Sequence, residues 1–383
     1  MAMIVNDFLR RCFQSRATKK SLTIVLGNEG GDMDSIVGSI YLAFFLEKSS
    51  LLGGKYYIPI LNFEKEDLPL RNDVVKLFSK YGVEMDLILS CRGNSGMEDY
   101  LDLKEIMPDV VLYDHNKLIA PQSFLSERVI AIVDHHFDEQ LYVEQTKRLR
   151  CLETTGSACT LVTELFRDAG LKVPCAELLL APIVLDTVNF NPSQKKATDR
   201  DIQASQWLMG QLSEQINVEK MFSDLSNWKN DIIGLSFAQH LRRDYKNFEF
   251  PFHGGGVESL QIGISSIACR LDEMIGSRSM NELVASCLEF VKSRQLDTLI
   301  LTFAGERGPG NYCRQCAFLA RGNVLEALKS YAKSSPEKIC FTTIDTAQQD
   351  EWEMISYDLS DPSVSRKKLA PSLGKFIAAW PKL

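Results

Sequence analysis

Short apolar runs recur through the first half of the chain and alternate with stretches of helical pattern. Such runs are typical of strands that are buried on both faces of a parallel sheet. The first run is followed by a glycine-rich loop at 27–35 and then by a largely apolar helical stretch. Strand, loop and buried helix in this order open a Rossmann-like α/β unit. We therefore predict a parallel sheet with strands at 22–26, 56–61, 86–89, 110–113 and 129–133.

The pattern changes after about residue 195. Residues 196–245 are polar and helical in pattern. Further runs of strand type follow at 248–250, 260–267, 298–303 and 339–343, and they predict a second, smaller α/β domain. We expect the chain to divide into a domain of residues 1–215 and a domain of residues 220–383.

The composition excludes several classes of protein. Of the 383 residues, 45% are hydrophobic and 24% are charged, which is ordinary for a globular protein with a sizeable core. No apolar run is long enough to cross a membrane, so we expect no membrane association. The net charge is −7, whereas non-specific nucleic-acid binders are usually basic. We therefore expect no nucleic-acid partner, and we expect a monomer because no coiled-coil pattern demands oligomerisation.

The ten cysteines are scattered along the chain without the spacing of a disulfide framework. No secretory apolar region precedes them, so we expect reduced thiols in a cytoplasmic protein. Cys313 and Cys316 form one C-x-x-C pair, but a zinc site needs a second pair of ligands at a useful spacing. Basic residues among the first twenty leave organellar targeting open, although Asp7 favours an ordinary amphipathic helix there.

Acidic and histidine side chains cluster at the ends of the predicted strands. Two acids follow the first strand, and an Asp-His-Asn tract and an Asp-His-His tract end the strands at 110–113 and 129–133. Ligands of an open α/β sheet bind beyond the carboxyl ends of its strands, so these side chains can converge. A further acid interrupts an apolar stretch at 178–190. The residues concerned are Asp32, Asp34, Asp114, His115, Asn116, Asp134, His135, His136 and Asp186.

This set of side chains favours metal chemistry. Carboxylates at close range repel one another, and divalent cations relieve that repulsion. Oxygen-rich ligation with one or two imidazoles suits Mg²⁺ or Mn²⁺, and two such ions can activate water and polarise a phosphoryl group. Taken singly, each pattern has a plainer explanation, such as solvated loop acids for Asp32 and Asp34 or a paired core residue for Asp186. The patterns together favour a metal site.

Four short motifs are similar to those of a known family. GNEGGDMDS at 27–35, LYDHN at 112–116, VDHH at 133–136 and PIVLDT at 182–187 resemble the motifs of the DHH phosphoesterase superfamily in order and spacing. The resemblance implies a Rossmann-like N-terminal domain, a smaller C-terminal α/β domain, and an active site in the cleft between them.

The resemblance also implies a set of metal ligands. Asp32, Asp34, Asp114, His135 and Asp186 match the ligand positions, with Asp114 bridging two ions, and Asp134 matches a partner that orients the imidazoles. Asn28 belongs to the same metal site and stands where family II pyrophosphatases carry a histidine ligand; this asparagine is similar to exopolyphosphatases and prune-like proteins. Loss of an imidazole makes the site harder, so we expect two Mg²⁺ ions, with Mn²⁺ or Co²⁺ as substitutes.

Two motifs in the second half resemble substrate-binding segments. DYKNF at 244–248 and SRKK at 365–368 are similar to the branch that holds family II pyrophosphatases, exopolyphosphatases and prune-like proteins. Arginine and lysine suit phosphate oxygens because they are charged hydrogen-bond donors. On its own, SRKK is better explained as an exposed run of charge, but its match to the family motif favours substrate binding. The residues that the resemblance assigns to substrate binding are His115, Asn116, His136, Lys246, Arg366 and Lys367.

The function that these motifs imply is that of an exopolyphosphatase. It would hydrolyse the terminal phosphoanhydride bond of inorganic polyphosphate, in short chains above all, and release orthophosphate by a two-metal mechanism. An inorganic pyrophosphatase, a nucleotide phosphodiesterase and a prune-like partner-binding protein are the alternatives. The nucleotide branch of the superfamily carries a GGGH motif near its C terminus, whereas this chain has HGGG at 253–256, which is either a second anion loop or a surface turn.

Overall fold

The structure is a computed structural model that describes residues 2–18, 22–54, 56–93, 97–232, 234–252, 258–308, 310–335 and 339–380. The HGGG tract at 253–256 lies outside the described residues. The chain forms two compact units, Met1–Asp231 and Ile232–Leu383. This division falls later along the chain than the predicted one, because the helix at Val218–Asn230 belongs to the first unit.

The first unit is built on a parallel sheet with strand order β3-β2-β1-β4-β5-β6. In the register of the sheet, Ile24 lies opposite Ile58 on one side and Val110 on the other. The strand order changes direction between β1 and β4, so the topological switch point of the sheet lies there. The strands are β1 (Leu22–Leu26), β2 (Tyr56–Glu64), β3 (Leu89–Arg92), β4 (Asp109–Tyr113), β5 (Val129–Asp134) and β6 (Arg150–Leu152).

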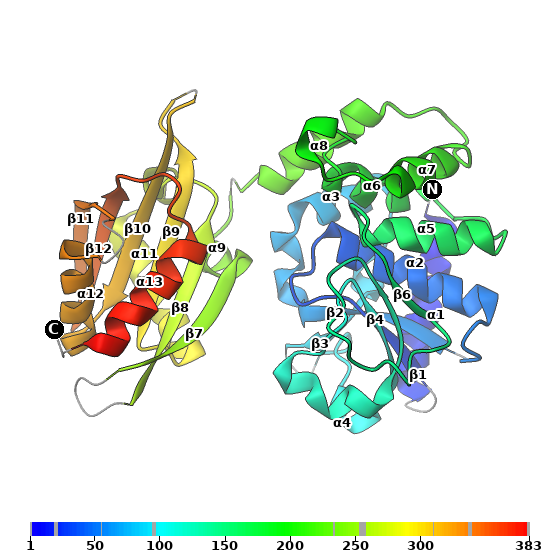
Figure 1. Ribbon diagram of the computed structural model, residues 1–383, viewed down its shortest axis with the longest axis horizontal. Coiled ribbons are helices and arrows are strands. Elements are labelled where there is room, and N and C mark those ends of the chain that lie inside the picture. The colour runs from blue at the N-terminus through cyan, green and yellow to red at the C-terminus, as the bar shows by residue number, and fades with distance from the viewer. Residues whose placement is uncertain are drawn as a thin grey trace. The chain divides into compact units, whose positions relative to one another are not determined.

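Helices pack around this sheet (Figure 1). One of them, Met33–Ser49, is apolar on nearly all sides and therefore buried along most of its length against strands and neighbouring helices. The first helix is amphipathic, as predicted. The helices of this unit are α1 (Met3–Ser15), α2 (Met33–Ser49), α3 (Asn72–Tyr81), α4 (Leu103–Ile106), α5 (Ala158–Asp168), α6 (Ala176–Asp186), α7 (Asp199–Met209) and α8 (Val218–Asn230).

The second unit holds a mixed sheet with strand order β11-β12-β10-β9-β8-β7, in which β8 and β9 are parallel and the other pairs are antiparallel. Neighbouring residues of β10 face opposite cores: Phe318 packs with residues of α12 and α13, and Leu319 with residues of α9 to α11. The strands are β7 (Tyr245–Pro251), β8 (Ser259–Ile267), β9 (Thr298–Glu306), β10 (Tyr312–Ala320), β11 (Phe341–Gln349) and β12 (Trp352–Leu359). The helices are α9 (Phe237–Arg243), α10 (Leu271–Ile275), α11 (Met280–Arg294), α12 (Gly322–Lys333) and α13 (Arg366–Ala379).

The predicted fold class is confirmed, with some strands shifted or missed. The expected strand at 86–89 is wrong in its first half, because Met85–Leu87 forms a 3-10 turn and β3 starts at Leu89. β6, β10 and β12 had no counterpart among the predicted strands. Cys313 and Cys316 lie three residues apart on β10 and so face opposite sides of the sheet, which prevents them from chelating one ion together.

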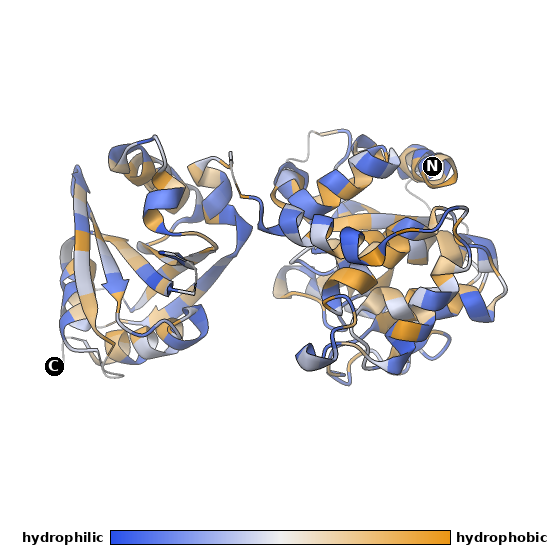
Figure 2. Cartoon of the chain, turned by 90° about the horizontal axis from the view of Figure 1, so that it is seen from above, coloured by the Kyte–Doolittle hydropathy of each residue, from blue (hydrophilic) through white to orange (hydrophobic). Residues whose placement is uncertain are grey.

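Apolar residues concentrate on the sheet of each unit and on the helix faces that cover it (Figure 2). The ten cysteines are all free thiols. Among the helices of the described residues, none combines the length and the apolar character that crossing a membrane requires.

Candidate metal centre

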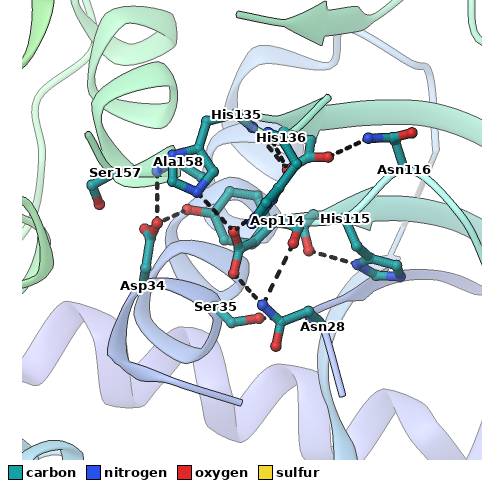
Figure 3. Close-up of polar contacts among 12 residues, drawn as sticks. Asn28, Asp34, Ser35, Asp114, His115, Asn116, His135, His136, Ser157 and Ala158 are labelled. Atoms are coloured by element: carbon teal, nitrogen blue, oxygen red, sulfur yellow. Dashed lines mark hydrogen bonds and ion pairs between the residues drawn. The ribbon is translucent and has the colours of Figure 1, made fainter. Parts of the chain in front are cut away.

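The candidate site lies at the carboxyl ends of β1, β4 and β5, beside the switch point of the first sheet. The loop after β1 carries Asn28 and leads to Asp34 in the first turn of α2. Asp114 follows β4, and His135 and His136 follow β5. Figure 3 shows the carboxylates of Asp34 and Asp114 together with the two imidazoles. Parallel strands bring the three loops to one edge of the sheet, as predicted.

Asp114 is the centre of the cluster. It is buried, and its backbone is left-handed with φ of 61°. Its Oδ2 accepts a hydrogen bond of 2.5 Å from Nδ2 of Asn28, and its Oδ1 lies 3.4 Å from Nε2 of His135 and 3.7 Å from Nδ1 of His136. Burial raises the pKa of Asp114 to about 7, with a contribution from Asp34 and against the opposing bond to His135. A cation at this carboxylate would relieve the cost of ionising it.

Both imidazoles are oriented by hydrogen bonds from their Nδ1 atoms. Nδ1 of His135 donates to the carbonyl of Thr155 at 2.9 Å, and this bond directs Nε2 towards Asp114. Nδ1 of His136 donates to Oδ1 of Asp134 at 2.7 Å. Burial lowers the pKa of His135, but the bond to Asp114 and the charge of Asp34 outweigh burial and raise it to about 10.

Asp134 accepts the hydrogen bond that orients His136. It is completely buried, and its Oδ2 accepts a 2.6 Å bond from Nδ2 of Asn116. Burial raises the pKa of this carboxyl, but the bonds from His136 and Asn116 outweigh burial and hold it below its usual value. Asp134 is therefore an ionised group that orients the imidazole of His136.

Asp34 is held at the N-terminus of α5. The backbone N–H groups of Ala158 and Cys159 donate to its two carboxylate oxygens at 2.6 and 2.8 Å. The hydroxyl of Tyr113 lies 3.2 Å from Oδ1 of the same carboxylate. The positive end of a helix stabilises an anion at this place. Sequence reasoning missed this anchor because its donors are backbone groups, although the Ser/Thr-rich tract at 154–157 was a signal for a helix start.

Asp32 and Asp186 complete the acidic group. Asp32 is exposed and caps α2, accepting a 3.1 Å bond from the N–H of Ser35. Asp186 is the last residue of α6, and its buried Oδ2 has no hydrogen-bond partner among the described residues. Burial, together with the charges of Asp34 and Asp32, raises the pKa of Asp186 well above its usual value. Three acids from two helices thus crowd one another beside Asp114.

Two predicted residues, both asparagines, have roles that differ from direct ligation or substrate contact in this structure. The amide of Asn28 donates to Asp114 and accepts from the N–H of Gly31 at 2.8 Å. The amide of Asn116 is used by Asp134, by the carbonyl of Phe137 and by the N–H of Glu139. Both asparagines therefore brace the loops that carry the acids and imidazoles.

His115 is not brought to the cluster. Its Nδ1 donates to the carbonyl of Tyr113 at 2.9 Å, and Figure 3 shows its ring directed away from His135 and His136. Burial lowers the pKa of His115, so the ring is neutral. A substrate contact by His115 stays a prediction.

The predicted cations of the second unit gather at one end of β7 and α13. The guanidinium of Arg366 donates to the carboxylate of Asp244 at 2.6 Å and to the carbonyls of Asp244 and Ile264 at 2.7 and 3.3 Å. Lys246 pairs with Ile264 across β7 and β8, which places it beside this contact, and Lys367 follows Arg366 on α13. Both lysines are exposed. Arg366 thus ties two elements together, while the lysines present their charge to solvent.

Two further residues that sequence reasoning missed hold the loops of the site. Asp201 is completely buried, and its carboxylate accepts hydrogen bonds from Thr160, Thr198 and the N–H of Gly156, beside the carbonyl that orients His135. Arg71 donates to the carbonyls of Gly30 and Gly31 at 2.7 and 3.2 Å, in the loop before Asp32. An acid or arginine far away in the sequence gives no local signal for such a role.

The donor set fits a small divalent cation. Ligand atoms of Asp114, His135 and His136 lie within 4.8 Å of one another. Asp186 offers a buried oxygen without a partner, and Asp34 adds a second buried carboxylate. Several carboxylates with one or two imidazoles are the ligands that Mg²⁺ and Mn²⁺ prefer, whereas a soft ion would require thiolates.

Comparisons with known proteins identify the family of the chain. The family model described as DHH family, N-terminal domain, matches residues 23–183, and the model described as DHHA2 domain matches residues 223–376. The chain therefore belongs to the DHH superfamily, as its motifs predicted.

Individual relatives come from a mammal and from an archaeon. The human protein named exopolyphosphatase PRUNE1 is 26% identical over 387 residues, which cover 98% of this chain and 80% of the human protein. A manganese-dependent inorganic pyrophosphatase of Methanocaldococcus jannaschii is 27% identical over 263 residues, which cover 65% of this chain and 75% of that protein. The crystal structure of an exopolyphosphatase-related protein from Bacteroides fragilis covers 98% of this chain and 97% of its own, with 12% identity and a TM-score of 0.38.

Proposed function

We propose that the protein is a metal-dependent phosphoanhydride hydrolase, and within that class an exopolyphosphatase. The observation that carries the proposal is the group of buried acids and oriented imidazoles around Asp114 at the switch point of the sheet. Membership of the DHH superfamily and relatives named exopolyphosphatase and inorganic pyrophosphatase support the same class. We propose that the protein acts in the cytoplasm as a monomer.

The side chains of the site have separate tasks in this proposal. Asp32, Asp34, Asp114, His135 and Asp186 hold two divalent ions, which supply Lewis-acid activation of water and of the phosphoryl group when they are bound. His136 is half exposed, and its Nδ1–H bond to Asp134 leaves Nε2 to contact a phosphate oxygen. Asn28 and Asn116 fix the orientation of Asp114 and Asp134.

The cations of the second unit bind the rest of the substrate. A polyphosphate chain carries about one negative charge per phosphoryl unit, so the ions of the first unit neutralise only its end. Lys246 and Lys367 are exposed and free to reach phosphate oxygens by rotating their long side chains. Arg366 holds β7 and α13 together and so keeps the two lysines in one place.

The test of this proposal is phosphate release from tripolyphosphate with Mg²⁺, compared between the protein and its Asp114→Asn variant. Asparagine tolerates the left-handed backbone at this position, so the variant removes the charge without straining the fold. We expect turnover to fall by at least about a thousandfold, as expected when a central electrostatic group is lost. Activity of the variant close to that of the unchanged protein would refute the metal assignment.

An inorganic pyrophosphatase is the second candidate, because a relative of that name covers part of the chain. We place this activity second because pyrophosphatases of this family carry a histidine ligand at the position of Asn28. We expect Asn28→His to tighten Mn²⁺ binding, because an imidazole is a softer ligand than an amide and suits Mn²⁺ better. Calorimetric titration of the metal-free protein with Mn²⁺ measures this, and equal affinities in both proteins would contradict the assignment of Asn28 to the metal site.

A nucleotide phosphodiesterase and a partner-binding protein remain the other hypotheses. Faster hydrolysis of nucleotide esters than of polyphosphate would favour the first. Capture of one stable partner by the catalytically inactive Asp114→Asn variant, together with no hydrolysis by the unchanged protein, would favour the second.

A further inference from the structure

Hydrogen bonds from the part of the chain that the structure describes leave the carboxylate of Asp34 one open acceptor position. A carboxylate offers about four lone pairs, two on each oxygen. Oδ1 accepts from the N–H of Cys159 at 2.8 Å and from the hydroxyl of Tyr113 at 3.2 Å, and so both of its lone pairs are used. Oδ2 accepts from the N–H of Ala158 at 2.6 Å, which leaves it one lone pair.

Tyr113 is the one of these three donors that is a side chain. Its hydroxyl also lies 3.5 Å from the sulfur of Cys159, but it has a single hydrogen. An ionised carboxylate is a much stronger acceptor than a thiol, so that hydrogen belongs to Asp34. The thiol of Cys159 in turn has the backbone carbonyl of Asp34 within 3.6 Å.

The fold makes room for this hydroxyl. Tyr113 is completely buried at the end of β4. Gly38 of α2 lies directly against its ring, and a Cβ built at Gly38 would overlap the hydroxyl. The phenol is thus fixed in place between α2 and α5, where a phenylalanine would fill the same apolar space without the donor.

We propose that Tyr113 is a positioning residue that confines Asp34 to one-oxygen ligation and thereby selects small octahedral cations over Ca²⁺. The inference rests on the proposed metal site. Mg²⁺ demands near-ideal octahedral geometry, which one oxygen per carboxylate satisfies, whereas Ca²⁺ accepts six to eight oxygens and often takes both oxygens of one carboxylate. With the hydroxyl in place, Oδ1 of Asp34 has no lone pair to offer as the second oxygen.

The test replaces Tyr113 by phenylalanine and measures binding of Mn²⁺ and Ca²⁺ to the chelator-stripped protein by calorimetry. Tyr41→Phe is the matched control, because Tyr41 is also buried and its hydroxyl bonds the carbonyls of Pro174 and Cys175 instead of a site residue. We expect Tyr113→Phe to shift the ratio of Ca²⁺ to Mn²⁺ affinity by about tenfold towards Ca²⁺, the lower end of the range for partners of metal ligands. The control should keep the ratio of the unchanged protein.

The outcomes separate this inference from the proposed function. An unchanged ratio in a folded Tyr113→Phe protein, or an equal shift in Tyr41→Phe, overturns the role of Tyr113 while the metal site stands. Failure of the unchanged protein to bind either ion overturns both. Gly38→Ala displaces the hydroxyl by a second route and must shift the ratio in the same direction, so the inference is testable even where Tyr113→Phe fails to fold.

Discussion

At the scale of single residues, Asp114 combines two features that destabilise a fold. It is a buried carboxyl group beside other acids, and it has a left-handed backbone that most side chains avoid. Groups of this kind persist in proteins at functional sites, where a bound ligand or the reaction itself requires them. Asp114 is therefore the residue at which stability and function should separate most clearly.

We expect Asp114→Asn to stabilise the protein in the presence of a chelator, although it abolishes turnover. Loss of the charge removes the cost of burying it and the repulsion from Asp34 and Asp32, which together outweigh the attraction of His135, and asparagine keeps the left-handed backbone. The gain should be on the order of 1 kcal/mol in the free energy of unfolding, or a few degrees in melting temperature. Thermal unfolding of both proteins with EDTA measures this gain. A lower melting temperature for the variant would show that the charge of Asp114 does not destabilise the metal-free protein.

A histidine in the second unit predicts a pH dependence of stability. Burial, with Arg278 and Arg243 nearby, lowers the pKa of His240 to about 4. The unfolded chain binds the proton at a pKa of about 6.5, so the stabilisation is complete above that pH and is lost as the pH falls towards 4. We expect the protein to be about 2 kcal/mol less stable at pH 5 than at pH 7 from this group alone.

Urea unfolding at the two pH values, compared between the unchanged protein and His240→Gln, isolates this contribution. The variant cannot take up the proton, so its stability should change less between pH 7 and pH 5. Equal pH dependence in the two proteins would show that His240 does not titrate as described.

The residues of the site divide into those that sequence patterns could indicate and those that they could not. Asp34, Asp114 and His135 stand at strand ends in recognisable motifs, and the structure brings them together. Other contributions come from distant segments of the chain. These are the N–H groups at the start of α5 and the carboxylate of Asp201, which accepts from the N–H of Gly156 next to Thr155. Their roles depend on packing between distant elements, which no local pattern records.

At the scale of elements, the contact between α13 and β7 organises the cationic end of the second unit. Arg366 contributes hydrogen bonds to two carbonyls and a carboxylate, and its side chain is only 14% exposed. Lys367 is its exposed neighbour on the same helix. A structural cation, Arg366, and an exposed cation that we propose for substrate binding, Lys367, thus stand side by side in the SRKK motif.

We expect Arg366→Met to affect the stability of the protein and Lys367→Met to affect substrate binding. Loss of Arg366 should reduce the free energy of unfolding by about 1–2 kcal/mol, because the carbonyls of Asp244 and Ile264 and the carboxylate of Asp244 lose this donor. Loss of Lys367 should leave stability unchanged and raise the KM for polyphosphate about tenfold, as one charge-assisted contact is removed. Lys368→Met is the matched control, since it removes the same charge one residue away, where the lysine bonds Ser363. An equal rise in KM for the Lys368 and Lys367 variants would contradict a specific contact.

The elements themselves were predictable where the apolar pattern was strong. β1, β4 and β5 are continuous apolar runs and were found close to their observed bounds. β10 carries Arg314 and Gln315 in its first half, and β12 carries acids within it, so neither strand is continuously apolar or alternating along its whole length. Both become strands because each pairs along its length with neighbours on two sides.

At the scale of the whole molecule, the two units supply different chemistry. The first unit holds the acids and imidazoles, and the second holds the cations of Lys246, Arg366 and Lys367. The fold class of both units followed from the order of apolar runs, whereas the boundary depended on α8, a polar helix that buries Met221 and Leu225 in the first unit.

The measurement that tests the central claim most directly is phosphate release with Mg²⁺ from pyrophosphate, tripolyphosphate and long-chain polyphosphate, side by side. Asp114→Asn and a chelator provide the background for each substrate. An exopolyphosphatase should cleave tripolyphosphate and the longer chains and leave pyrophosphate intact. Pyrophosphate as the best substrate would contradict the proposed specificity, and no release from any of the three would contradict the proposed function altogether.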